Sequence, residues 1–428
     1  MAEIPVIQIL DKAQYATQAL VSLPNALPLP PLADSSIRVR TEVFSLTMNN
    51  LSYARLGDFL NWWDVHPLPE ATPAPYNDAT KYGRTNCWGY ARVLESTSAT
   101  VPAGSYIFGY LPLGTLPQDL LVAPAHPSLP HHITVLNPHR QHILVIYNRY
   151  QVALPSAPLA AQIAAGRSTP VALDALLIVM HLTAYVLAEY AFPADTARAV
   201  HPSQHGKAPW SAADADLAGA TVLVFAPGSK AALCFAWMLR QRRGRGAGEP
   251  RRVVGVASRL SAAYARGTGL YDEVLASEEK PGDLMPRLGA GAGDKVAVFE
   301  FGGRGAAAAA WTAALQEARE RVQFVSLGSA QPRGEDLAKE KMQGPPPTHV
   351  GRVPIVFANA DDLRLSGIAK DGEAQFYKGM DESWAKLREE GFKGFRVTWG
   401  EGMEDVKKGW DRLNRGDLGP EEGLVFKV

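Results

Sequence analysis

Segments that read as β-strands and as α-helices alternate along the chain between residues 221 and 330. The strand-like runs, rich in Val, Leu and Phe, cover residues 221–226, 252–258, 271–277, 294–303 and 321–330. The helix-like runs lie between them, at residues 230–241, 260–270 and 307–318. Parallel neighbouring strands need a crossover connection, and a helix is the usual one. The alternation therefore predicts an α/β fold with a doubly wound parallel sheet.

The chain before this region has a different pattern. Short apolar runs that alternate or contain β-branched residues are separated by Pro-rich turns, at residues 36–46, 91–96, 105–113 and 132–136. This pattern is typical of a β-rich domain with many loops. Residues 171–192 carry apolar side chains at helical spacing, but the run is too short and too polar for a membrane span. We interpret it as a buried helix of a soluble protein.

A chain of 428 residues is long enough for two or three domains. After residue 345 come a further strand-like run, a helix and a final strand at 423–428. We predict a split architecture, in which residues 1–165 begin the β-rich domain, 166–344 form the parallel-sheet domain, and 345–428 return to the first domain.

The charge and cysteine content exclude several classes of protein. Lys and Arg total 43 and Asp and Glu total 43, so the formal net charge is zero. A nucleic-acid binder needs a surplus of basic residues, so we expect none. Cys87 and Cys234 are too few for a disulfide framework, and residues 1–18 lack a signal peptide, so we expect a cytoplasmic protein without a membrane partner. Five histidines between residues 126 and 142 match no zinc-site spacing, and we predict no metal.

The first strand-to-helix turn decides whether a nucleotide could bind. Residues 223–235 read LVFAPGSKAALCF, which resembles the opening of a nucleotide-binding βαβ unit but lacks its GxGxxG glycines. Gly228 could supply the bend, while Ser229 and Lys230 lie where a helix N-terminus presents N–H groups to an anion. In the alternative interpretation, Ser229 caps the helix and Lys230 points to solvent. The turn taken alone slightly favours this alternative.

The end of the second strand favours a phosphate. NAD sites place an acidic residue there to hold the ribose hydroxyls, whereas NADP sites carry small polar and basic residues. Here Ser258 and Arg259 follow the strand and no carboxylate does. We therefore predict NADPH if a nicotinamide cofactor binds.

Glycines follow the fourth and fifth strands of the predicted sheet. The fourth ends in Phe301, Gly302 and Gly303, and the fifth is followed by Gly328. Glycines at the carboxyl ends of parallel strands let backbone approach a ligand that lies across the sheet edge. For each glycine alone, turn formation is the likelier explanation. Together with the second strand they predict one cofactor site at this edge.

Several segments of the chain together resemble a known family. Residues 36–58, WGYARVLES at 88–96 and GSYIFGYLPLG at 104–114 resemble the GroES-like domain of the medium-chain dehydrogenase/reductase superfamily, on its zinc-free quinone-oxidoreductase and enoyl-reductase side. VLVFAPGSKAAL at 222–233 and VVGVASR at 253–259 follow the superfamily's cofactor domain in the same order. The resemblance covers nearly the whole chain. It implies a GroES-like domain and a Rossmann-like domain, in a branch with a degenerate glycine fingerprint.

The resemblance also implies where catalysis would occur. In zinc-free members the substrate lies between the two domains, and a hydroxyl or water supplies a proton while hydride moves from the nicotinamide. In the matching residues here, Tyr53 would act as the general acid and Asn49 would orient it, and Tyr110 matches a region near the nicotinamide. A half-buried Tyr53 with its hydroxyl in water is equally consistent with the sequence.

Three functions remain open from the sequence. The first is an NADPH-dependent, zinc-independent reductase of an activated double bond in a small-molecule substrate, such as an enone, quinone or enoyl thioester. The second is a cofactor-free lyase, hydrolase or cyclase acting on a polyketide-like secondary metabolite. The third is a non-catalytic binding subunit. The resemblance further suggests a homodimer formed through edge strands of the cofactor domains.

Overall fold

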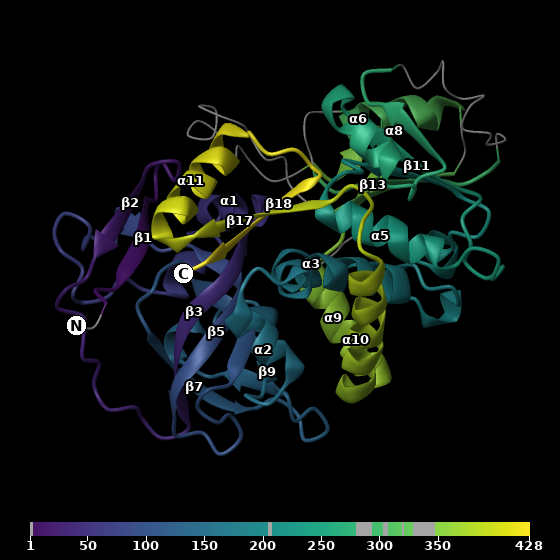
Figure 1. Ribbon diagram of the computed structural model, residues 1–428. Helices are drawn as coiled ribbons and strands as arrows, with labels where there is room; N and C mark the ends of the chain where they lie inside the picture. The colour runs from purple at the N-terminus through teal and green to yellow at the C-terminus, as the bar shows by residue number, and fades with distance from the viewer. Residues whose placement is uncertain (1–2, 204–207, 280–292, 303–306, 319–320, 328–346) are drawn as a thin grey trace.

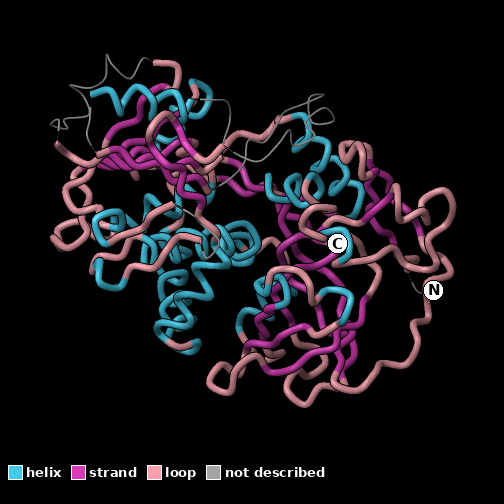
Figure 2. The backbone as a smooth tube through the Cα atoms, turned by 180° about the vertical axis from the view of Figure 1, so that it is seen from behind, coloured by secondary structure: helices cyan, strands magenta, loops and turns pink. Residues whose placement is uncertain are grey.

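The computed structural model describes residues 3–203, 208–279, 293–302, 307–318, 321–327 and 347–428. Two parts stand side by side, a β-rich part that holds both labelled ends of the chain and a parallel-sheet part (Figure 1). Seen from behind, strands dominate the β-rich part, while helices cover the sheet of the other part (Figure 2). Gly303 and Gly328 lie outside the described residues.

The β-rich part is built on an eight-stranded sheet in the order β17-β18-β3-β5-β6-β9-β8-β7. Because β7 also pairs with β3, six of these strands close into a barrel. A smaller sheet of order β2-β1-β4 lies beside it. The strands are β1 (Val6–Asp11), β2 (Gln18–Ser22), β3 (Ser36–Leu46), β4 (Tyr82–Gly83), β5 (Asn86–Ser96), β6 (Tyr106–Pro112), β7 (Gln118–Pro124), β8 (His132–Val135), β9 (Arg149–Ala153), β17 (Arg396–Glu401) and β18 (Glu422–Lys427).

Helices, most of them short, pack around this barrel and connect its strands. They are α1 (Met48–Arg55), η1 (Trp62–Asp64), η2 (Pro138–Arg140), η3 (Val145–Asn148), α2 (Pro158–Ala165) and α11 (Gly402–Arg415). The alternation in β3 predicts its packing, because Ile37 and Val39 point into the barrel core and are almost completely buried. The predicted β-rich domain is therefore confirmed.

The parallel-sheet part contains seven strands among the described residues, in the order β12-β11-β10-β13-β14-β16-β15. All pairs are parallel except β15 with β16. This is the doubly wound order, and it confirms the predicted Rossmann-like sheet. The strands are β10 (Thr221–Phe225), β11 (Arg252–Ala257), β12 (Glu273–Ala276), β13 (Val296–Glu300), β14 (Val322–Ser326), β15 (His349–Val350) and β16 (Val353–Phe357).

Helices bury both faces of this sheet. Trp311 and Leu315 of α8 pack on one face, and side chains of α3 and α5 pack on the other. Strand β10 is buried along its whole length, which explains its unbroken apolar sequence. The helices are α3 (Thr169–Val186), η4 (Leu187–Ala191), η5 (Thr196–Arg198), α4 (Ala212–Ala215), α5 (Lys230–Arg240), α6 (Arg259–Gly267), α8 (Ala307–Ala318), α9 (Ala360–Asp371) and α10 (Glu373–Glu390).

The return to the β-rich part begins later than we predicted. We placed it at residue 345, but β16 pairs with β14 in the parallel sheet, and α9 and α10 pack against α3. The first C-terminal element in the eight-stranded sheet is β17. The sequence of a short apolar strand does not indicate which strand it pairs with, so the same sequence is compatible with either sheet.

The apolar run at 171–192 forms the central helix of the molecule. Residues 169–191 are long and apolar enough to cross a membrane by length and composition, but 78% of the most apolar window is buried inside the structure. The helix packs against α5, α10 and β3. The prediction of a buried helix is confirmed.

A carboxylate on this helix joins the two parts at a contact we call the α3 seam. Asp174 of α3 accepts hydrogen bonds from the Tyr90 hydroxyl of β5 (2.8 Å), the Trp384 indole of α10 (2.9 Å) and the Arg388 guanidinium (3.2 Å). Burial raises the pKa of Asp174, while Arg388 and the hydrogen bonds lower it. The seam therefore fixes β5 against α10 through one saturated buried charge.

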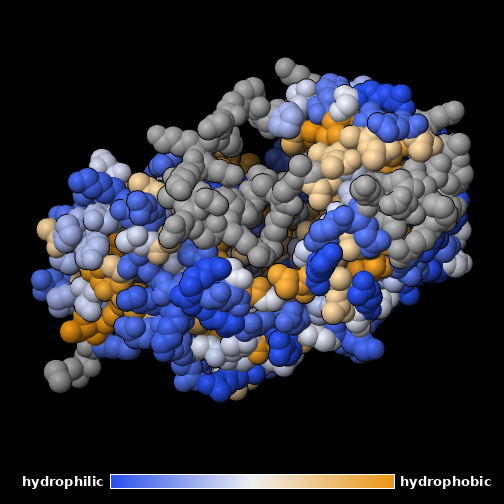
Figure 3. All heavy atoms as spheres, turned by 90° about the horizontal axis from the view of Figure 1, so that it is seen from above, coloured by the Kyte–Doolittle hydropathy of each residue, from blue (hydrophilic) through white to orange (hydrophobic). Residues whose placement is uncertain are grey.

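The face of the molecule seen from above is mostly hydrophilic, with hydrophobic residues in small patches (Figure 3). Such scattered patches are usual for a folded protein surface.

Candidate functional site

Five aromatic side chains gather in a cluster at the edge of the β-rich part. They are Tyr53 of α1, Trp62 of η1, Trp88 of β5, Tyr110 of β6 and Tyr147 of η3. Ring centroids lie 4.9 Å apart for Tyr53 and Trp62, 5.1 Å for Tyr53 and Tyr110, and 4.5 Å for Tyr110 and Tyr147. We call this group the aromatic cluster. It brings two of the three predicted catalytic residues into contact.

Local sequence explains how α1 is positioned. The Thr47 backbone N–H donates to the Asn50 side chain (2.6 Å), and the Thr47 hydroxyl accepts from the Asn49 backbone N–H (3.3 Å), which forms a capping box. Asn50 also donates to the Asn86 carbonyl at the start of β5 (2.7 Å). The cap thus begins the helix and ties it to the barrel, so that Tyr53 one turn later points into the cluster.

The Tyr53 hydroxyl is buried and held by an indole. It accepts a hydrogen bond from Trp88 Nε1 at 3.0 Å, and the residue is 4% exposed. Burial raises the pKa of Tyr53 to about 12, although hydrogen bonds with Trp88, Asn49 and Tyr147 oppose the shift. A phenol with this pKa stays protonated at neutral pH, so it can donate a proton or hydrogen bond to an oxygen that gains negative charge.

The other two predicted catalytic residues lie beside it. The Asn49 amide is partly buried and lies 3.9 Å from Met180 Sδ on α3, so it reaches the parallel-sheet part. The Tyr110 hydroxyl is buried and has no hydrogen-bond partner among the described residues. Burial, and then the neighbouring Tyr53 and Tyr147, raise the pKa of Tyr110 well above its ordinary value.

The cluster lies near the carboxyl edge of the parallel sheet. Asp361 in the first turn of α9, just after β16, is among the charges that raise the pKa of Tyr147, after burial and Tyr53. Tyr147 is partly exposed, whereas Trp62 and Trp88 are 7% exposed. Tyr147 therefore forms the solvent-facing side of the cluster, at the junction of the two parts.

The turn after β10 differs from its predicted geometry. Ala226 adopts a left-handed backbone with φ of 55°, whereas Gly228, which we expected to supply the bend, does not. Gly228 instead provides room, because a Cβ atom there would lie 2.8 Å from the Pro420 side chain. The loop before β18 is thus packed directly against this turn.

The two polar residues of the turn both have internal contacts. Ser229 is the N-cap of α5 and accepts from the Ala232 backbone N–H (3.4 Å). Lys230 Nζ donates to the Glu422 carbonyl (3.1 Å) and lies 5.5 Å from the Phe395 ring. Burial lowers the pKa of Lys230 to about 8. We call this contact between the turn and residues 395–422 the α5 seam.

The end of β11 is open by contrast. Ser258 is the N-cap of α6, and Ser258 and Arg259 are both exposed. Among the residues at the neighbouring strand ends, Phe301 packs on Phe235 with ring centroids 5.5 Å apart. A Cβ atom on Gly302 would lie 3.1 Å from that of Ala226, so the turns after β10 and β13 meet at the point where the strand order reverses.

Sequence reasoning missed several members of these sites. Trp88 reads as an ordinary inward residue of a strand, and no motif in the sequence indicates a role for Tyr147. Trp62 joins the cluster, whereas its neighbour Trp63 packs in the separate barrel core. The partners of Lys230 come from the far end of the chain, and no local pattern indicates them. Among the described residues, no group of three His, Cys, Asp or Glu could hold a metal ion.

A family model described as "Protein of unknown function (DUF2855)" matches residues 44–419. The chain belongs to this family. No curated protein matches the sequence. The description of the family names no activity.

Solved structures share the fold of this DUF2855 protein at low identity. CurA from Vibrio vulnificus in complex with NADPH has a TM-score of 0.51 and 15% identity, covering 99% of both chains. A mutant enoyl thioester reductase from Candida tropicalis has a TM-score of 0.53 and 11% identity, covering 100% of both. CurF ER cyclopropanase from the curacin A biosynthetic pathway has a TM-score of 0.50 and 12% identity, covering 99% of both. These likenesses show that the chain shares the fold of these proteins.

Proposed function

We propose that this protein is an NADPH-dependent, zinc-independent reductase of an activated double bond in a small molecule. The observation that carries the proposal is the exposed Ser258 and Arg259 pair at the end of the second strand, where a carboxylate would favour NAD. A guanidinium at a helix N-terminus suits a ribose 2′-phosphate. Structures of this fold described as NADPH complexes support the same cofactor.

The residues along the carboxyl edge of the parallel sheet suit one end of a dinucleotide better than its middle. Arg259 and Ser258 suit the adenosine end, whereas Pro420 and Lys230 fill the turn after β10 with contacts of the chain itself. When bound, NADPH would supply a hydride to an electron-poor carbon. Tyr53 would hold a proton close to the substrate oxygen, and Asn49 would orient that hydroxyl. The aromatic walls of the cluster would exclude water from a flat, conjugated substrate.

A second function is favoured by the same turn. Ala226, Ser229 and Pro420 leave no free glycine loop for a pyrophosphate, which supports an enzyme that kept the fold and uses the aromatic cluster without a cofactor. The CurF cyclopropanase illustrates that proteins on this fold are not all described as reductases. The non-catalytic alternative has no specific observation in its favour.

The deciding experiment is a titration of NADPH and NADH into the full chain and into Arg259→Ala. We expect Arg259→Ala to weaken NADPH binding about tenfold to a hundredfold, the scale of a lost charge-assisted hydrogen bond, and to leave NADH binding unchanged. Arg266→Ala is the matched control, because Arg266 is an exposed arginine in the last turn of the same helix. If the unaltered chain binds neither dinucleotide, the reductase proposal fails and the cofactor-free function replaces it.

A further inference from the structure

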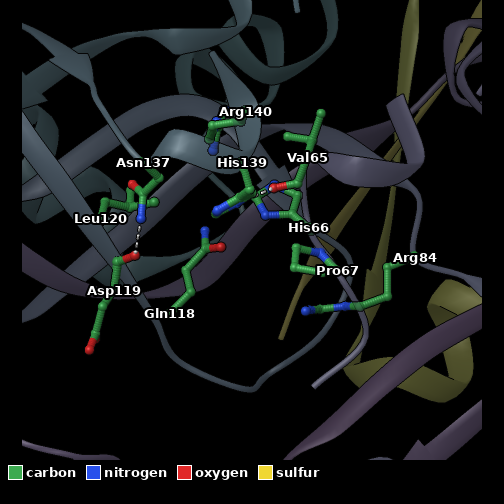
Figure 4. A pocket seen from close by; sticks show the side chains of 10 residues that line it. All are labelled: Val65, His66, Pro67, Arg84, Gln118, Asp119, Leu120, Asn137, His139 and Arg140. Atoms are coloured by element: carbon green, nitrogen blue, oxygen red, sulfur yellow. Dashed lines mark hydrogen bonds between the residues drawn. The ribbon is translucent and has the colours of Figure 1, made fainter. Parts of the chain in front are cut away.

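A cavity of about 180 Å³ lies in the β-rich part, apart from the aromatic cluster (Figure 4). Arg84 from the connection between β4 and β5, Gln118 at the start of β7 and Arg140 of η2 line it, together with His66 and His139. In Figure 4 the two arginines approach from different sides, and the Gln118 amide points toward the histidines. The cavity therefore collects hydrogen-bond donors from three separate elements.

Several of these donors have no acceptor. Nε and Nη2 of Arg84, Nη1 of Arg140 and Nε2 of Gln118 are buried without a hydrogen-bond partner. Arg84 is 5% exposed and Arg140 is 1% exposed. A buried donor left unpaired costs free energy, and a charged one costs more than a neutral one. The three side chains that carry these atoms line one cavity, so this region holds more donors than its own acceptors pair.

The positive charges of the two arginines are not neutralised by a carboxylate in the cavity lining. The other nitrogens of Arg140 donate to neutral oxygens, namely Asn148 Oδ1 (2.7 Å), the Tyr147 carbonyl (2.6 Å) and the Tyr150 hydroxyl (3.2 Å). The acid in the lining, Asp119, already accepts from Arg38 at both oxygens (2.7 and 2.9 Å). Two buried guanidinium groups thus face the cavity without a free carboxylate in its lining.

The histidines add no charge to the cavity at neutral pH, and the Nε2 of each faces a backbone carbonyl. His66 Nε2 lies 3.3 Å from the Tyr110 carbonyl, and His139 Nε2 lies 3.3 Å from the Val65 carbonyl. Burial lowers the pKa of both imidazoles, and the charge of Arg140 lowers them further. The positive charge of the cavity therefore comes from the arginines alone.

We propose that this cavity binds a small oxyanion, a phosphate or carboxylate group, through Arg84, Arg140 and Gln118. A guanidinium presents paired N–H donors that match two oxygens of either group. The cavity volume admits a group of this size together with ordered water. The bound anion would accept from the orphaned donors and compensate the two buried charges. This inference does not depend on the proposed reductase function.

The test is calorimetric titration of inorganic phosphate, and separately of acetate, into the full chain at constant ionic strength set with chloride. We expect saturable binding of at least one of them, and Arg84→Met to weaken it by at least about tenfold, the effect of losing a charge-assisted hydrogen bond. Phosphate binding tighter than acetate binding supports a phosphate ligand, and the reverse supports a carboxylate. Arg92→Met is the matched control, because Arg92 is an exposed arginine on β5.

Thermal unfolding keeps the proposal falsifiable if binding is hard to measure. Without phosphate or acetate, Arg84→Met should be at least as stable as the unaltered chain, because it removes an uncompensated buried charge. With phosphate or acetate present, the unaltered chain should gain midpoint temperature and Arg84→Met should not. A variant that fails to fold, or an unaltered chain that binds neither anion, would overturn the proposal.

Discussion

The two seams between the β-rich part and the parallel-sheet part are built from different chemistry. At the α3 seam, the Asp174 carboxylate accepts from Tyr90, Trp384 and Arg388, three side chains from two elements. At the α5 seam, the Lys230 ammonium donates to a backbone carbonyl, and a Cβ atom added to Gly228 would lie 2.8 Å from Pro420. The first seam satisfies its buried charge and the second leaves a cation poorly compensated. The candidate phosphate turn therefore lies at the weaker of the two contacts.

The largest expected effect comes from breaking the α3 seam. Asp174→Ala leaves the buried Tyr90 hydroxyl and Trp384 indole, and the partly exposed Arg388 guanidinium, without their acceptor. We expect it to lower the free energy of unfolding by about 3–5 kcal/mol, since each buried donor left unpaired costs about 1–3 kcal/mol. Urea unfolding followed by circular dichroism measures this loss. Glu389→Ala, an exposed change beside Arg388 on α10, should stay within about 0.5 kcal/mol. If the two variants lose equal amounts of unfolding free energy, Asp174 contributes no more to stability than an exposed surface residue does.

The second largest effect is expected in the aromatic cluster, when the hydroxyl of Tyr53 is removed. Tyr53→Phe removes the buried hydroxyl but keeps the ring packing on Trp62 and Tyr110. If the reductase proposal holds, kcat with NADPH and an enone or quinone should fall about a hundredfold to ten-thousandfold, while the Kd for NADPH stays unchanged. Stopped-flow oxidation of NADPH measures both. Tyr76→Phe, outside the cluster, serves as the control, and an unchanged kcat in Tyr53→Phe would rule out its role as the proton donor.

The smallest effect is a pH dependence at the α5 seam. Burial lowers the pKa of Lys230 to about 8, below its unfolded value of about 10.4, so the unfolded state binds more protons between these values. The free energy of unfolding should therefore rise with pH above about 8, and Lys230 should account for about 1–2 kcal/mol of that rise by pH 9.5. Lys230→Met should show a flatter profile over this range. Parallel profiles in urea unfolding would mean that Lys230 is solvated in the folded chain.

Much of the fold could be predicted from sequence because its signals are local. The apolar strand 221–225 and the small-residue helix that follows it specify a parallel βαβ unit, and the order of such units leaves few topologies. The boundary at residue 345 could not be predicted in the same way. The strand Val353–Phe357 is short and apolar, and only its pairing with β14 assigns it to the parallel sheet.

The candidate sites were only partly predictable for a related reason. Tyr53 and Asn49 lie four residues apart on one helix, so a local pattern brings them together. Arg84 and Arg140 come from distant loops, and nothing in either loop indicates that both line one cavity. The same holds for Lys230, whose acceptor is a backbone carbonyl near the other end of the chain. A backbone acceptor leaves no signature in the amino-acid sequence.

The pairing of β18 with β3 constrains the order in which the chain can fold during synthesis. Leu424 lies opposite Leu46, so the last strand completes a sheet begun near the start of the chain. The elements from α3 to α10 are contiguous in sequence and can form their core as soon as they emerge from the ribosome. On the flank of β3 away from β5, β7 already pairs with residues 36–39, but residues 43–46 stay unpaired until β18 has been translated. Pairing of these residues is a long-range closure of the kind that slows folding. A nascent chain that stops before β18 should therefore depend on chaperones more than the finished protein does.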